Sequence, residues 1–184
     1  MTTPALTVIQ QKARIGLVAD SHCGADRPLP TAVFDVFRDA TLILHLGDSG
    51  AISALDSLDE VAPVVATRGQ DDAADDPRFA PVRVIEAGGV RIGAFFDLAP
   101  TGIALDERGA AMPVREALKA TFGAAVDVVA FAATHEPRVA VRDGVLFVNP
   151  GSATLPAKPR AGVVGNVALL DVNNGVATVE IIDL

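Results

Sequence analysis

The sequence predicts a single α/β domain in which mixed β-sheets are stacked between helices. Over the first 70 residues, apolar segments of strand length alternate with amphipathic segments of helix length, an order typical of a parallel sheet. From Ala80 onwards three hairpin signatures follow, which makes the sheet mixed. The chain has 184 residues, 50% of them hydrophobic, so one domain can bury a sizeable core.

Three strands and two helices account for the first part of the chain. Residues 14–19 are apolar and are followed at once by polar residues, as in a buried strand. Two prolines precede residues 31–40, where hydrophobic side chains recur at helical spacing. Residues 41–46 form the next strand, residues 52–58 a second helix and residues 63–67 a third strand. This alternation predicts parallel pairing of the three strands.

Hairpins dominate the remainder of the chain. Residues 81–96 read as two strands around a Gly-Gly turn, and residues 138–149 as two strands around Asp-Gly. Between them we expect a helix over residues 114–121 and a buried strand over residues 126–131. Residues 163–184 form a last hairpin around Asn-Gly. Residues 1–13 are expected to be frayed, within one domain that spans residues 1–184.

Composition excludes several classes of function. No segment reaches the roughly 18 consecutive apolar residues of a membrane helix, so we expect no membrane contact. The net charge is -8 and the 15 Lys and Arg form no basic run, which argues against a nucleic-acid groove. A single cysteine, Cys23, allows no internal disulfide and favours a reducing compartment. The cytoplasm is the expected location.

Polar side chains that can bind a metal follow the expected strands. Asp20 and His22 lie two residues apart just after the first strand, and Asp48 follows the second. Ligands gather where the carboxyl ends of adjacent parallel strands meet, so these side chains are expected to converge. His135 follows the strand at 126–131. His45, in contrast, lies within an apolar strand, and we interpret it as a buried, hydrogen-bonded histidine.

Five short motifs in order give the chain a family resemblance. They are ADSHCG at 19–24, LHLGD at 44–48, TRGQDD at 67–72, ATHEP at 133–137 and NPGS at 149–152. Together they resemble the calcineurin-like metallophosphoesterases, in the branch of the YfcE-like phosphodiesterases and the retromer subunit vacuolar sorting protein twenty-nine. The resemblance runs from about Arg14 to the C-terminus. It implies a four-layer α-β-β-α sandwich with two mixed sheets and a dinuclear metal site on the loops at one end.

Carried over onto this sequence, the resemblance implies one complete metal position. Its ligands are Asp20, His22, Asp48 and His135, with Asp48 bridging towards a second metal. Such mixed nitrogen and oxygen ligands suit Mn, Fe or Zn, and we expect one ion per chain.

The second metal position of the family is degenerate here. Where the family has an Asn and two His ligands, this chain has Gln70, Phe96 and Ala133. Only Gln70 keeps a side-chain oxygen, so it is included as a further candidate ligand. Substitute carboxylates are available from Asp71, Asp72 and Asp97, although the acidic run around the first two is more simply interpreted as a solvated loop.

The resemblance also suggests roles around the substrate. Asp48 would orient the metal, with Arg68 and Asp72 near the leaving group. The NPGS loop would bind phosphate through Gly151 and Ser152, with Arg160 nearby, since exposed backbone N–H groups can face an anion. A purely structural turn explains this loop equally well.

Two functions therefore remain open from the sequence. One is hydrolysis of a small phosphate ester, weak or absent because a second metal normally clamps the attacking and leaving oxygens. The alternative is a non-catalytic interaction module on the same fold, which would bind a protein partner or form a homo-oligomer.

Overall fold

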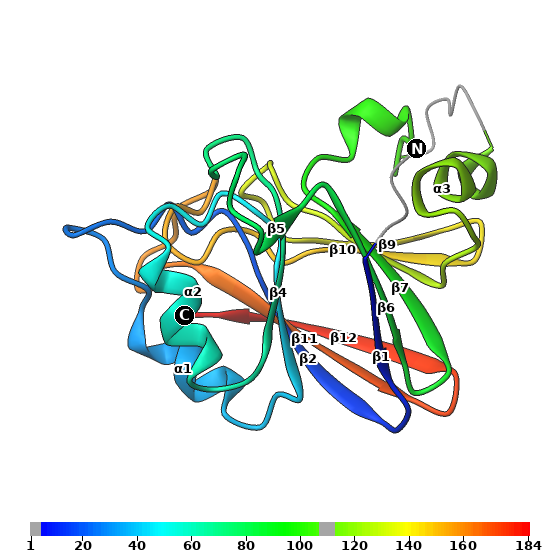
Figure 1. Cartoon of the computed structure of the whole chain (residues 1–184). Helices are drawn as coiled ribbons and strands as arrows, with labels where there is room; N and C mark the ends of the chain where they lie inside the picture. Colours follow the sequence, from blue (N-terminus) through cyan, green and yellow to red (C-terminus); the bar gives the residue numbers. More distant parts are fainter. Residues whose placement is uncertain (1–4, 107–112) are drawn as a thin grey trace.

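The computed structural model describes residues 5–106 and 113–184 and contains two mixed six-stranded sheets packed face to face (Figure 1). The first sheet has the order β1-β6-β7-β8-β10-β9. Its strands are β1 (Ala5–Ile9), β6 (Val82–Ala87), β7 (Val90–Phe95), β8 (Val128–Ala130), β10 (Val145–Asn149) and β9 (Arg138–Arg142).

The second sheet carries the alternating first half of the chain, and its order is β12-β11-β2-β3-β4-β5. Its strands are β12 (Val176–Asp183), β11 (Asn166–Asn173), β2 (Ala13–Val18), β3 (Leu42–His45), β4 (Val64–Thr67) and β5 (Phe79–Ala80). The predicted parallel pairing of β2, β3 and β4 is confirmed. The three predicted hairpins are confirmed as the antiparallel pairs β6-β7, β9-β10 and β11-β12.

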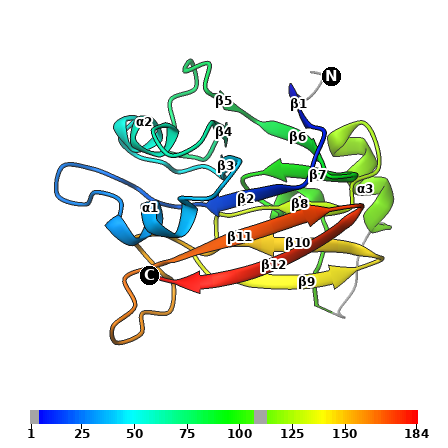
Figure 2. The same ribbon diagram turned by 90° about the horizontal axis from the view of Figure 1, so that it is seen from below.

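Helices cover the outer faces of the two sheets. Helices α1 (Thr31–Phe37) and α2 (Ser53–Asp59) lie on the second sheet, whereas α3 (Val114–Phe122) lies on the first (Figures 1 and 2). A short 3-10 helix, η1 (Ala99–Thr101), follows β7. Together these elements make the four-layer α-β-β-α sandwich that the family resemblance implied. Among the described residues, no helix is long and apolar enough to cross a membrane.

The hydrophobic core follows these layers. Between the sheets, buried aliphatic side chains from both meet, for example Leu17 and Leu44 from one sheet and Ile92 from the other. Under α3, Phe122 stacks on Phe95 with ring centroids 5.5 Å apart. Phe37 of α1 packs so closely on β2 that a Cβ on Gly16 would lie 2.8 Å from its ring. This close packing fixes the strands whose ends carry the polar candidates.

The N-terminal segment differs from the expectation. Residues 1–13 were expected to be frayed, yet residues 5–9 form β1, which pairs in parallel with β6 at the edge of the first sheet. Leu6 and Val8 remain more than half exposed on this strand. Its order therefore depends mainly on backbone pairing with a strand some 80 residues away, a contact that local hydrophobic periodicity does not reveal.

Candidate metal centre

Three loops at the carboxyl ends of β2, β3 and β8 carry the candidate ligands. Asp20, His22, Asp48 and His135 all have positive φ angles, between 38° and 56°. Side chains other than glycine rarely adopt this conformation, and such strain persists only where the surrounding structure imposes it. The backbone of these loops is interlocked, since Asp20 N–H donates to Gly47 O and His22 N–H donates to Asp48 O. All four candidate ligands therefore lie at strained backbone positions.

Asp20 is a fully buried carboxylate at the centre of this group. Neither of its oxygens has a hydrogen-bond partner among the described residues. Burial raises the pKa of Asp20 to about 6; the adjacent His135 opposes this shift, while the nearby Asp48 adds to it. A buried carboxylate without donors is costly unless a cation neutralises it. Asp20 thus has the environment of a metal ligand.

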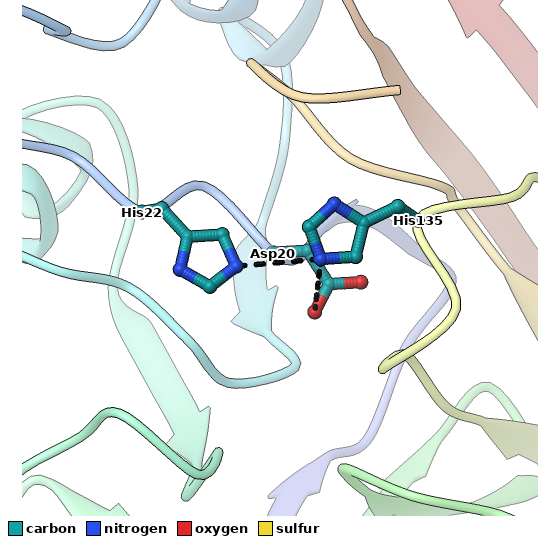
Figure 3. Close-up of side chains that lie close together, drawn as sticks. All are labelled: Asp20, His22 and His135. Atoms are coloured by element: carbon teal, nitrogen blue, oxygen red, sulfur yellow. Dashed lines mark hydrogen bonds and ion pairs between the residues drawn. The ribbon is translucent and has the colours of Figure 1, made fainter. Parts of the chain in front are cut away.

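Two imidazole rings face Asp20, as Figure 3 shows. The Nδ1 atom of His135 lies 2.8 Å from Leu155 O, and because a carbonyl only accepts, Nδ1 carries the proton. The lone pair of His135 Nε2 then points into the site, where it lies 3.3 Å from His22 Nε2 and 4.0 Å from Asp20 Oδ1. Fixing the tautomer through the second ring nitrogen is a common feature of metal-binding histidines.

Asp48 and Asp71 approach His22 at its two different ring nitrogens. Asp48 Oδ2 lies 3.8 Å from His22 Nε2, and Asp71 Oδ2 lies 3.3 Å from His22 Nδ1. Asp48 Oδ1 accepts a hydrogen bond from Asp71 N–H at 2.9 Å. A Cβ on Gly69 would lie 2.1 Å from Asp48 Oδ1, so only glycine permits this approach.

The donor atoms fall into two sets that share His22. In each set the donor atoms lie within 4.8 Å of one another: Asp20, His22 and His135 in the first, and His22, Asp48 and Asp71 in the second. Two bonds of about 2.0–2.2 Å to a shared ion span up to about 4.4 Å, which covers the 3.3 and 4.0 Å separations of His135 Nε2 from His22 and Asp20. Both sets combine imidazole and carboxylate, so the residues present fit a divalent transition metal.

Asp72, predicted to lie near a leaving group, makes hydrogen bonds to the loop that carries Asp48. Its carboxylate accepts hydrogen bonds from the backbone N–H groups of Asp48, Ser49 and Gly69 and from Ser49 Oγ, at 2.7–2.9 Å. With four donors on its two oxygens, Asp72 holds the Asp48 loop against the loop after β4. The structure supports a positioning role for this side chain.

The NPGS loop, residues 149–152, and the residues after it form hydrogen bonds to the loops that carry the candidate ligands. Ser152 Oγ donates to Asp20 O at 2.6 Å, and Thr154 Oγ1 donates to Ser21 O at 2.6 Å. Asn149 Nδ2 donates to Ala132 O and to Thr134 Oγ1, which ties the end of β10 to the His135 loop. Ser152 is fully buried, so the structural interpretation of this loop accounts for its hydroxyl.

The remaining predicted site residues are Gln70, Arg68 and Arg160. Gln70 is exposed, and Arg68 is half-buried at the end of β4, where its backbone N–H donates to Ala80 O. Arg160 forms an ion pair with Asp183 at the end of β12. The structure thus ties Arg160 to the neighbouring strand β12.

Phe96 and Ala133 stand where the family has histidine ligands, and neither side chain can bind a metal. Phe96 is 8% exposed and belongs to the core between the sheets, where a Cβ on Gly47 would lie 2.7 Å from its ring. Ala133, beside the His135 loop, keeps a positive φ of 69° without a donor side chain. His45 is buried as predicted: it accepts from Gly47 N–H and its Nε2 bonds Ser21 Oγ.

Several positioning residues were not recognised from the sequence. Ser49, Asn149, Thr154 and Leu155 act through backbone groups or through contacts with distant segments. The one available signal was their location beside the motifs.

Comparison with known proteins agrees with this geometry. The model of the calcineurin-like phosphoesterase superfamily domain matches residues 14–175. A probable metallophosphoesterase of Methanocaldococcus jannaschii is 36% identical over 147 residues, which are 79% of this chain and 70% of that protein.

Solved structures show the same fold. Vacuolar protein sorting 29 from Cryptosporidium parvum aligns with a TM-score of 0.69 at 19% identity, covering 95% of this chain and 98% of that one. Vacuolar protein sorting 29 from Entamoeba histolytica, solved in complex with Zn²⁺, aligns with a TM-score of 0.64 at 21% identity, covering 92% and 98%. The match to the family model and the identity with the Methanocaldococcus jannaschii protein show that this chain belongs to the calcineurin-like phosphoesterase superfamily.

Proposed function

We propose that this protein is a metal-dependent phosphoric ester hydrolase that acts slowly on a small phosphate ester. The observation that carries the proposal is Asp20, a buried carboxylate without a hydrogen-bond partner among the described residues, whose Oδ1 lies 4.0 Å from Nε2 of His135. Membership of the superfamily implies a divalent metal, and these residues supply its ligands. We assign the primary ion to Asp20, His22 and His135, with Asp48 beside it.

The chain's own residues hold and orient this centre. Leu155 O fixes the tautomer of His135, and Asp72 fixes the loop that carries Asp48. A divalent ion bound here would lower the pKa of water and stabilise negative charge on phosphate oxygens. Arg68 follows β4 at the same edge of the sheet, and we retain it as the cation nearest the leaving group.

The second metal position is incomplete in this proposal. Asp71 approaches His22 and replaces a ligand that the sequence assigned to Gln70, but Phe96 and Ala133 contribute none. An exposed carboxylate that shares its histidine with the first set should hold a second ion weakly. Because the second ion clamps the reacting oxygens, we expect low turnover.

The metal content of the protein tests this assignment. After incubation with Mn²⁺ and desalting, elemental analysis should find about one ion per chain in the wild type. Asp20→Asn and His135→Gln should lose it, whereas Asp75→Asn, in the same acidic loop as Asp71, should retain it. Hydrolysis of bis(p-nitrophenyl) phosphate should follow the metal content. Protein that binds no metal and shows no turnover would contradict the proposal.

A second candidate function is favoured by Phe96 and Ala133. If the chain had no catalytic role, two metal ligands of the family could be replaced by a core aromatic side chain and a methyl group, as they are here. The chain would then be an interaction module on a phosphoesterase fold. Full occupancy of the metal site without detectable hydrolysis of phosphate mono- or diesters would support the interaction module over the hydrolase.

A further inference from the structure

A cavity of about 580 Å³ lies between the segments that follow β7 and β8. Residues 97–106 form one wall, and residues 131–138 form the other. β7 and β8 are parallel neighbours, so both walls rise from the same edge of the sheet. Its volume lies within the usual range for small-molecule sites, about 300–1,000 Å³.

The cavity shares a wall with the candidate metal centre. Thr134 and Glu136 both line the cavity, and His135 between them turns its ring towards Asp20. Asn149 fixes this wall through its hydrogen bond to Thr134 Oγ1. A phosphate held at the metal centre would therefore have its ester substituent next to this cavity.

Apolar side chains provide the interior of the cavity. Ile103 and Phe131 of the hydrophobic cluster under α3 line the cavity, and Leu98 and Leu105, which pack against that cluster, are only partly buried there. Burying an apolar group against such a surface contributes about 25 cal/mol per Å². The interior thus suits a hydrocarbon or aromatic substituent.

Charged groups of both signs surround the described part of the cavity. Asp97, Asp106 and Glu136 line it together with Arg138. Lys158 forms an ion pair with Glu136, and Arg142 Nη1 donates to Asp106 O at 3.0 Å, so three cations accompany the three carboxylates. The described lining therefore favours neither sign of charge, and its apolar side chains set the selectivity.

We propose that this cavity binds the organic group esterified to the phosphate and selects apolar groups. The preferred substrate class is then a phosphodiester with an aryl substituent. This inference rests on the proposed hydrolase function, and it assigns the substrate side of the same site.

Matched substrates test the apolar preference. We would compare p-nitrophenyl phosphodiesters whose second substituent is phenyl or methyl, using the Mn²⁺-loaded full chain. The phenyl diester should have a KM several-fold lower, because the additional apolar surface that it buries contributes about 25 cal/mol per Å². Equal KM values in the wild type would overturn the apolar preference.

Filling the cavity tests its location. Ala104→Trp should raise KM for bis(p-nitrophenyl) phosphate at least several-fold with little change in metal content. Ala125→Trp, an equal substitution in the loop before β8 at the opposite end of the sheet, should leave KM unchanged. Unchanged KM in Ala104→Trp, in protein that melts cooperatively, would overturn the proposal.

A binding measurement separates this inference from the hydrolase function. Saturation-transfer NMR with diphenyl phosphate should detect binding to the wild type and to Ala125→Trp, and not to Ala104→Trp, with and without Mn²⁺. If that pattern is found in protein that binds no metal and hydrolyses nothing, the cavity stands and the hydrolase function fails. If metal content and turnover are as proposed but binding is the same in all three proteins, the cavity fails alone.

Discussion

Asp20 shows how a single residue can be unfavourable for folding and suited to function. Its carboxylate is buried without a hydrogen-bond partner among the described residues, and burial raises its pKa to about 6, from an ordinary value near 3.8. At pH 7 the ionised form therefore costs about 3 kcal/mol of folding free energy, at about 1.4 kcal/mol per pKa unit. A bound cation would remove that cost.

Replacing this carboxylate tests the trade-off. In metal-free protein at pH 7, Asp20→Asn should raise the free energy of unfolding by about 1–2 kcal/mol, because a neutral amide costs less to bury than a charge. The same variant should lose metal binding. Urea unfolding with and without Mn²⁺ measures both effects, and a variant less stable than metal-free wild type would contradict this account.

His45 gives the protein a second pH-dependent residue, of opposite sign. Burial lowers its pKa to about 4, so the folded state keeps it neutral while the unfolded state protonates near pH 6.5. Between these values the unfolded state binds more protons, so this histidine's contribution to stability is present above pH 6.5 and is lost as pH falls towards 4. Asp20 in metal-free protein does the reverse, gaining stability as pH falls from 6 to 4.

Comparison with His45→Gln isolates this contribution. Both proteins contain Asp20, so its effect is common to both and cancels in their difference. At pH 7 the variant should be less stable, because it loses hydrogen bonds to Gly47 and Ser21. The deficit should shrink by about 3 kcal/mol between pH 6.5 and 4, as measured by urea unfolding. A deficit that does not change with pH would show that His45 keeps an ordinary pKa.

At the scale of elements, the metal centre depends on contacts between loops. The loops after β2 and β3 exchange backbone hydrogen bonds, and the loop after β4 is fixed to them by Asp72. Each loop leaves a parallel strand at the same edge of the sheet, which brings residues about 25 positions apart within hydrogen-bonding distance.

Asp72→Asn tests this brace. The amide nitrogen would face backbone N–H donors where a carboxylate oxygen now accepts, so at least one buried donor loses its partner. We expect a loss of about 1–3 kcal/mol in the free energy of unfolding and weaker Mn²⁺ binding. Asp75→Asn provides the control for the acidic loop. If Asp72→Asn abolished turnover while stability and metal affinity were unchanged, Asp72 would be catalytic, as first predicted.

For the whole molecule, we expect metal binding and folding to be coupled. Because the donor sets come from loops far apart in the chain, the unfolded protein cannot present them together. Mn²⁺ at about 100 times its Kd should stabilise the fold by about 2.7 kcal/mol. For a chain of this size that corresponds to a rise in Tm of about 5–10 °C. Calorimetry of wild type and Asp20→Asn measures it, and an equal rise in both would locate the metal elsewhere.

Much of this architecture was predictable because its signals are local. Apolar runs of strand length, helical spacing and turn dipeptides gave the parallel strands, α3 and the three hairpins. The edge strand β1 was missed, since two of its side chains are largely exposed and its pairing partner is remote in sequence.

The sequence by itself determined the types of ligand and the loops that carry them: carboxylates and imidazoles directly after apolar strands, in the order of a known family. Only the tertiary structure decided which of them meet. It brought Asp71 to His22, gave Asp72 a bracing role and tied Arg160 to β12. The physical reason is that residue type fixes what a side chain can bond, whereas strained loops and contacts between remote strands fix what it reaches.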